Sequence, residues 1–139
     1  MTTAGEKMRV LIYSDDADTR AKVRLAMGRR PAADLPRVEA VECATEAAVF
    51  KHLDDGDVDV AVLDGEAWPA GGMGICRQAK DEIYDCPPTL VIIGRPDDGW
   101  LATWSMADAV VSHPIEPIAL ANGVAGLIRQ CTGQQLRTT

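Results

Sequence analysis

Two acidic stretches of the sequence each follow an apolar run, and together they could place carboxylates side by side. Asp64 ends the run VDVAVLD, and SDDAD (14–18) overlaps the end of the run RVLIYS. If these runs are neighbouring parallel strands, their carboxyl ends meet at the edge of the sheet where ligands bind. Carboxylate oxygens there suit a hard cation such as Mg²⁺, which takes one or two carboxylates and keeps several waters. The sequence therefore predicts a weak Mg²⁺ site built from Asp15, Asp16 and Asp64. The alternative is that Asp16 or Asp18 only caps the helix that follows, and this is the role we expect for Asp18.

The elements that must position these acids alternate between short β-branched runs and segments with helical spacing. The expected strands are 9–14, 38–43, 58–64, 89–94 and 109–114. The expected helices are 16–29, 44–54, 73–83, 98–107 and 116–130. Strands that are apolar on both faces and joined by crossover helices form a parallel sheet covered on both sides. We therefore predict an α/β, flavodoxin-like (βα)5 fold with a doubly wound five-stranded parallel sheet in the order 2-1-3-4-5.

The length and composition are those of one domain with an acidic surface. The chain has 139 residues, 47% of them hydrophobic, which is enough to close a single core. We expect that core to span residues 8–130, with a flexible N-terminus and a frayed tail, TGQQLRTT (132–139). No leader or effector domain is expected. The formal charge of −7 opposes nucleic-acid binding, which requires an excess of Lys and Arg.

The cysteines and the apolar runs bear on the cellular setting. The four cysteines lie far apart with no CxxC pair, so we expect reduced thiols in a cytoplasmic protein rather than a disulfide framework or a zinc site. Every apolar run is much shorter than the roughly 20 residues that cross a bilayer. We therefore expect no direct membrane insertion, and any association with the cytoplasmic face of a membrane would have to come through a partner.

Two alternative sites on this kind of sheet fit the residues poorly. A flavin site would need a first loop rich in Ser, Thr and Gly to hold phosphate, and SDDAD is acidic. A haloacid-dehalogenase-like phosphatase would need a second aspartate two residues after Asp64, where Glu66 stands. We therefore expect neither flavin nor nucleotide, and a regulatory module rather than an enzyme.

Residues 8–130 resemble a response-regulator receiver domain, the CheY-like phospho-acceptor module of two-component signalling. The resemblance implies that Asp64 accepts a phosphoryl group and that an acidic pair after the first strand holds Mg²⁺. Two alignments of that strand are open. One places Ser14 and Asp15 on the acidic pair, and the other restores Asp15 with Asp16 but misplaces the helix that follows. We prefer the first.

The positions that sense phosphate in receivers carry other residue types here. In the preferred alignment Ser14 replaces one acid, Ile93 replaces the switch hydroxyl, Val110 replaces the switch aromatic residue, and His113 replaces the lysine. Isoleucine cannot hydrogen-bond a phosphoryl oxygen, and an imidazole lacks the fixed charge of a lysine at pH 7. Because a switch moves only by the difference in stabilisation between its two states, phosphorylation should shift this one little. The pattern favours an atypical receiver, or pseudo-receiver.

The segment DDGWLATWSMA (97–107) offers a candidate partner-binding site. Trp100 and Trp104 are four residues apart and share one face of the expected helix, on the side that receivers commonly use for partners. They would either pack inward, as large residues usually do, or form an exposed anchor of the kind enriched at interfaces.

Two strings point to a narrower resemblance. LDGEA.P.GGMGI and GRPDD.WLA.W, with dots for variable positions, resemble an actinobacterial group of stand-alone receivers linked to respiratory complex I, the proton-pumping NADH dehydrogenase. The resemblance implies a protein-binding regulatory subunit, an accessory subunit of complex I. The alternative is a phosphorylatable single-domain regulator that accepts phosphate on Asp64 from a histidine kinase in a phosphorelay.

Overall fold

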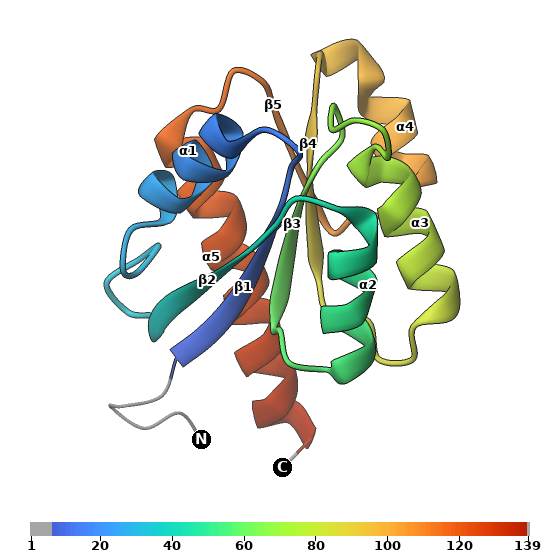
Figure 1. Ribbon diagram of the computed structural model, residues 1–139. Coiled ribbons are helices and arrows are strands. Elements are labelled where there is room, and N and C mark those ends of the chain that lie inside the picture. Colours follow the sequence, from blue (N-terminus) through green and yellow to red (C-terminus); the bar gives the residue numbers. More distant parts are fainter. Residues whose placement is uncertain (1–6, 139) are drawn as a thin grey trace.

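A five-stranded parallel sheet lies between two layers of helices in the computed structural model shown in Figure 1. The structure describes residues 7–138. The strands are β1 (Lys7–Tyr13), β2 (Arg37–Cys43), β3 (Val60–Asp64), β4 (Thr89–Ile93) and β5 (Ala109–Ser112). Their order is β2-β1-β3-β4-β5 and every neighbouring pair is parallel, so the predicted flavodoxin-like fold is confirmed.

The helices divide between the two faces of the sheet (Figure 1). On one face lie α1 (Ala17–Met27) and α5 (Pro117–Thr138), and on the other lie α2 (Glu46–Asp55), α3 (Gly72–Glu82) and α4 (Gly99–Trp104). Because side chains alternate along a strand, each central strand contributes to both cores. In β1, for example, Val10 packs in the core beneath α1 and α5, and Leu11 packs in the core beneath the other three helices. Among the described residues, no helix has the length and apolar character needed to cross a bilayer.

Two segments differ from the sequence-based expectation. The helix expected at 98–107 is shortened to α4, which has 6 residues and follows the 3-10 turn η1 (Pro96–Asp98). It ends early because the chain reverses at Met106, whose φ of 64° lies in the left-handed region. The tail expected to fray at 132–139 is instead helical as far as Thr138, where α5 ends; Gln134, Gln135, Leu136 and Arg137 favour a helix although Thr132 and Gly133 do not. The expected flexible N-terminus, residues 1–6, lies outside the described residues.

The register of the strands brings three segments together at the carboxyl edge of the sheet. Tyr13 pairs with Leu63, so the residues that follow them, Ser14 and Asp64, emerge side by side. On the other side of β3, the end of β4 pairs with β5, and the backbone N–H of His113 donates to the carbonyl of Ile93 at 2.8 Å. The edge of the sheet therefore collects the ends of β1, β3 and β5 around one carboxylate.

Candidate functional site around Asp64

Asp64 ends β3, and only 4% of its surface is exposed. The Ser14 hydroxyl donates to its Oδ2 at 2.8 Å, and the Glu66 backbone N–H donates to its Oδ1 at 2.9 Å. The Nε2 atom of His113 lies 3.0 Å from Oδ1, so the tautomer with hydrogen on Nε2 donates there as well. Both oxygens of the candidate phospho-acceptor are therefore engaged within the protein.

These hydrogen bonds are what a buried carboxylate requires, since burial without partners is strongly unfavourable. Ser14 is itself fully buried, and its Oγ also accepts the backbone N–H of Asp16 at 3.1 Å. The Ser14 hydroxyl thus connects the start of α1 to Asp64. Of the residues at the end of β1, the hydroxyl and not a second acid contacts the acceptor.

The two acids expected beside Asp64 have other partners. The Oδ1 atom of Asp15 accepts the backbone N–H of Trp68 at 2.9 Å. Asp16 is the N-cap of α1 and accepts from the Asp18 backbone N–H at 3.1 Å and from the Thr19 hydroxyl at 2.9 Å. The Thr19 hydrogen bond, followed by the Asp18 N–H, lowers the pKa of Asp16. The expectation that Asp18 caps this helix was wrong, because Asp18 lies in the first turn and Asp16 supplies the cap.

The carboxylates fit a Mg²⁺ ion poorly as they are arranged. In the part of the chain that the structure describes, no group of three or more His, Cys, Asp or Glu side chains is placed to hold a metal ion. A cation would have to compete with Ser14 and His113 for Asp64, and with the Trp68 N–H for Asp15. Mg²⁺ takes only one or two protein carboxylates and keeps its waters, so weak binding to Asp15 and Asp64 stays a prediction.

The loop between β3 and α3 is held tightly against the end of β1. Besides the bond from Trp68 to Asp15, the Tyr13 hydroxyl donates to the carbonyl of Ala70. Burial, followed by the charge of Asp15, raises the pKa of Tyr13. Sequence reasoning missed this anchor, although a tyrosine in a run of aliphatic residues is a usable signal, because its buried hydroxyl must find a partner.

The residues predicted to be altered switch positions lie on or next to β4 and β5: Ile93 ends β4, Val110 is the second residue of β5, and His113 follows β5. Ile93 is buried and packs in the core beneath α2, α3 and α4. The next residue, Gly94, lies directly under the Glu66 carboxylate, so a larger side chain there would require Glu66 to move. Neither Ile93 nor Gly94 offers a hydroxyl, and Glu66 brings negative charge to the position. Val110, on β5, is partly exposed and supplies no aromatic ring.

The tryptophans of α4 lie on the outside of the molecule. Trp100 is 69% exposed and Trp104 is 49% exposed, which contradicts inward packing for both. The Arg77 guanidinium lies 5.7 Å from the centroid of the Trp104 ring and donates to the Trp104 carbonyl at 3.1 Å. We call these two tryptophans, with the partly exposed Met106 just after the helix, the α4 surface.

Comparison with known proteins places the chain among signalling receivers. It is 50% identical over 129 residues to an uncharacterised response regulatory protein of Mycobacterium tuberculosis, found in two strains, and the match covers 93% of this chain and 97% of the relative. No protein-family model matches the chain.

Solved structures show the same fold at low sequence identity. The two-component transcriptional regulator AraC from Clostridium phytofermentans is 16% identical with a TM-score of 0.76, covering 94% of this chain and 98% of that one. The receiver domain of a putative LuxO repressor from Vibrio parahaemolyticus is 15% identical with a TM-score of 0.74, covering 96% and 99%. Together with the close mycobacterial relative, these findings show that the chain belongs to the response regulators and has the CheY-like receiver fold.

Proposed function

We propose that this receiver works as a protein-binding regulatory subunit whose docking does not depend on phosphorylation of Asp64. The observation that carries the proposal is the hydrogen bonding of the acceptor. Ser14, His113 and the Glu66 N–H already satisfy both oxygens of a carboxylate that is almost wholly buried. An attack on phosphorus from Asp64 would have to use the one lone pair left on Oδ2, beside the Ser14 hydrogen bond, or break one of these bonds.

The residues around Asp64 would also stabilise a phosphorylated form only weakly. Ile93 and Gly94 supply no hydroxyl for a phosphoryl oxygen, and the Glu66 carboxylate over Gly94 would repel it. A ligand or modification shifts an equilibrium only by its differential interaction with the two states. Phosphorylation of this chain is therefore a weak driver of conformational change.

Docking requires a surface that is available in the unmodified protein, and the α4 surface meets that requirement. Two indoles four residues apart present rigid apolar area to solvent, and tryptophan is enriched among residues that dominate binding energy. The partner we propose is respiratory complex I, at the cytoplasmic face of the membrane. This follows from the resemblance of LDGEA.P.GGMGI and GRPDD.WLA.W to receivers linked to that enzyme.

A phosphorelay regulator is the second candidate, and one observation favours it. Asp64 lies at the carboxyl end of β3 in a receiver fold, where receivers carry their phospho-acceptor, and an imidazole rather than a hydrophobic side chain stands beside it. In this case a histidine kinase would be the partner, and Asp64 would be essential for output.

The two candidates make opposite predictions for one experiment. Tagged wild-type protein and Asp64→Asn are used as baits on native membranes, and the captured proteins are identified by mass spectrometry. We expect both baits to capture the same complex I subunits, because the asparagine keeps the shape of Asp64 and docking needs no phosphate. Capture by the wild type alone, or of a histidine kinase in place of complex I, would contradict the proposed function.

A further inference from the structure

A pocket of about 340 Å³ lies between α1 and the start of α5, on the opposite face of the sheet from α4 (Figure 1). Its lining is mainly apolar. Leu25 and Ala26 come from α1, Ile115 and Pro117 come from the segment where α5 begins, and Lys22 adds one charged side chain. Leu25 is 76% exposed, so this pocket opens to solvent. We call it the α1–α5 pocket.

The wall on the α5 side of this pocket is a short segment between two fixed points. At one end, the His113 backbone N–H donates to the Ile93 carbonyl at 2.8 Å. At the other end, the Glu116 carboxylate accepts a backbone N–H from the first turn of α5 at 2.7 Å. Between them, Pro114 and Ile115 form no hydrogen bond with any described residue. The position of the wall therefore depends on how firmly the residues at its two ends are held.

The side chain of Asp64 holds His113 at a second point. Its Oδ1 atom lies 3.0 Å from Nε2 of the imidazole. Asp64 is itself fixed by the Ser14 hydroxyl and the Glu66 backbone N–H, so it is a rigid point of attachment. A hydrogen bond to a charged group contributes more than one between neutral groups, and its loss leaves a buried acceptor with one partner fewer. Any change that takes Oδ1 away from His113 should therefore loosen one end of the pocket wall.

No comparable connection runs from Asp64 to α4. Its three side-chain hydrogen bonds go to the end of β1, to the residue after β5 and to its own loop. The strand that leads toward α4 ends at Ile93, which has no polar atom in its side chain and packs in the core beneath α2, α3 and α4. A change at Asp64 thus has a direct bond to the wall of the α1–α5 pocket and no side-chain bond toward α4.

We propose that Asp64 positions the wall of the α1–α5 pocket through His113, so that a change in the carboxylate alters the shape of this pocket and leaves the α4 surface as it is. A change at one site shifts a conformational equilibrium only by its differential interaction with the two states. Here the difference is the hydrogen bond to His113. The inference does not depend on docking through Trp100 and Trp104, because it concerns the other face of the sheet.

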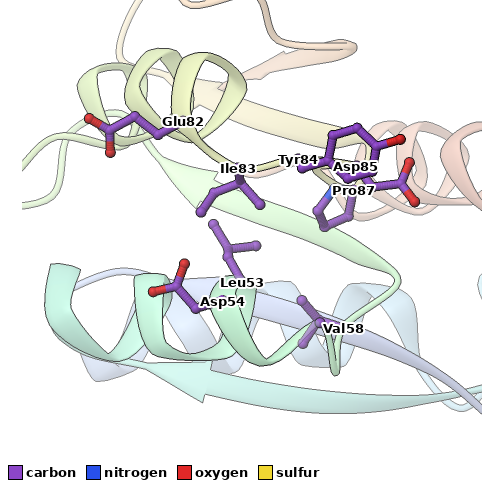
Figure 2. Close-up of a pocket in the computed structure, with 9 residues that line it drawn as sticks. Leu53, Asp54, Val58, Glu82, Ile83, Tyr84, Asp85 and Pro87 are labelled. Atoms are coloured by element: carbon purple, nitrogen blue, oxygen red, sulfur yellow. The ribbon is translucent and has the colours of Figure 1, made fainter.

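The chain offers a matched comparison for a test. His52 and His113 are its two histidines, and each has a ring nitrogen 3.0 Å from an aspartate oxygen, with side chains 27% and 26% exposed. His52 lies beside a different pocket, of about 380 Å³, at the amino end of the sheet between the C-terminal ends of α2 and α3. Figure 2 shows Leu53 and Ile83 pointing toward one another inside that pocket. Loss of each histidine–aspartate pair should affect the pocket beside it and not the other.

The test follows the methyl and amide signals of the full chain by NMR, with Leu25 as the main reporter because it lies on the α1 side of the pocket. His113→Leu removes the donor to Asp64, and His113→Gln keeps one. Both variants lack the imidazole ring, so the difference between them isolates the hydrogen bond. We expect Leu25 to shift about threefold more in His113→Leu than in His113→Gln, since residues that share a contact network are coupled. His52→Leu should shift Leu53 and leave Leu25 in place.

Substitutions at Asp64 show whether it acts through His113. Asp64→Ala should shift the signals of Leu25 and Ile115, whereas Asp64→Asn should leave them in place, because its amide oxygen still accepts from His113. In the His113→Leu background neither substitution should add a further shift at Leu25, as expected when two residues act through one contact. Circular dichroism checks that each variant is folded. If Asp64→Ala does not fold, the comparison of His113→Leu with His113→Gln decides.

Three results would overturn the proposal. The first is an equal shift of Leu25 in His113→Leu and His113→Gln. The second is a shift of Leu25 by Asp64→Ala that is as large in the His113→Leu background as in the wild type. The third is a shift on α4, followed at Ala102, as large as the shift at Leu25.

Discussion

At the carboxyl end of β3 the Asp64 carboxylate has hydrogen bonds on both oxygens, whereas on α4 the indoles of Trp100 and Trp104 extend into solvent. The first region has a carboxylate that could react, but both of its oxygens already accept hydrogen bonds. The second region has no reactive group, but its apolar side chains are exposed to solvent. Together they show that a receiver fold can bury and hydrogen-bond the carboxylate at the end of β3 while it leaves aromatic side chains exposed on another surface. The following predictions test how closed the first region is and how much binding the second provides.

The largest effect is expected where α3 packs against the end of β3. A Cβ on Gly72 would lie 2.7 Å from the Asp64 carbonyl oxygen and 2.8 Å from the Asp64 carbonyl carbon. Backbone atoms cannot yield as a flexible side chain does, so Gly72→Ala should lower the free energy of unfolding by about 2–3 kcal/mol. Denaturant unfolding measures this change.

The matched control is two residues further along the same helix. A Cβ on Gly74 meets nothing within 4 Å, and Gly→Ala in a helix usually stabilises by about 0.5–1 kcal/mol. Gly74→Ala should therefore be neutral or stabilising. If Gly72→Ala is as well tolerated as Gly74→Ala, the backbone of Asp64 can move away from α3, and the Asp64 site is less rigid than its hydrogen bonds indicate.

The second effect concerns the exposed region. Trp100→Ala or Trp104→Ala should weaken binding to the captured partner by about 2 kcal/mol, the scale of a truncated interface anchor. Asp64→Asn should leave the affinity nearly unchanged. Surface plasmon resonance against the purified partner gives the three values.

Stability measurements decide how a loss of binding is interpreted. Because both indoles are largely exposed, the tryptophan variants should unfold within about 1 kcal/mol of the wild type, checked by circular dichroism. If well-folded tryptophan variants bind normally and Asp64→Asn does not, the comparison between the two regions is reversed and the phosphorelay function is supported.

A third, smaller effect is expected at Asp64 itself. A small phosphodonor, or beryllofluoride as its mimic, should modify or occupy Asp64 slowly and incompletely, because Ser14 and His113 hold the carboxylate. Amide shifts at Ile93, Val110 and α4 should be minor. Mass spectrometry gives the extent of modification, and NMR gives the shifts. Fast stoichiometric modification with large shifts on α4 would show that the site opens readily and that the two regions are coupled.

The smallest effect is expected from Mg²⁺. Titration should move the Asp15 and Asp64 amide signals only at millimolar metal, since the ion must displace the Trp68 N–H and the partners of Asp64. Asp15→Asn should abolish the response. Asp16→Asn should preserve it, because the amide oxygen still caps α1. Tight binding that requires Asp16 would favour the alternative alignment of the first strand, with Asp15 and Asp16 as the metal pair.

The sequence predicts the sheet well because its central strands are short apolar runs buried on both faces, and Asp64 and Ser14 follow two of them directly. It also predicts the position of His113, which follows β5 in the same way. It does not predict the bonds from Trp68 to Asp15 or from Tyr13 to Ala70, because they depend on the conformation of a loop more than 50 residues away in the chain. Nor does it decide between metal binding and helix capping for Asp16, since a carboxylate at that position suits both.

The positions of the tryptophans decide what intrinsic fluorescence can report about this protein. All three tryptophans are exposed, Trp68 on the loop after β3 and the other two on α4, and no indole lies in either core. Intrinsic fluorescence is therefore a poor monitor of folding here, because the indoles are in contact with water before as well as after the chain unfolds. The same emission should move to shorter wavelength when a partner covers the α4 surface, so the native protein carries its own reporter of complex formation.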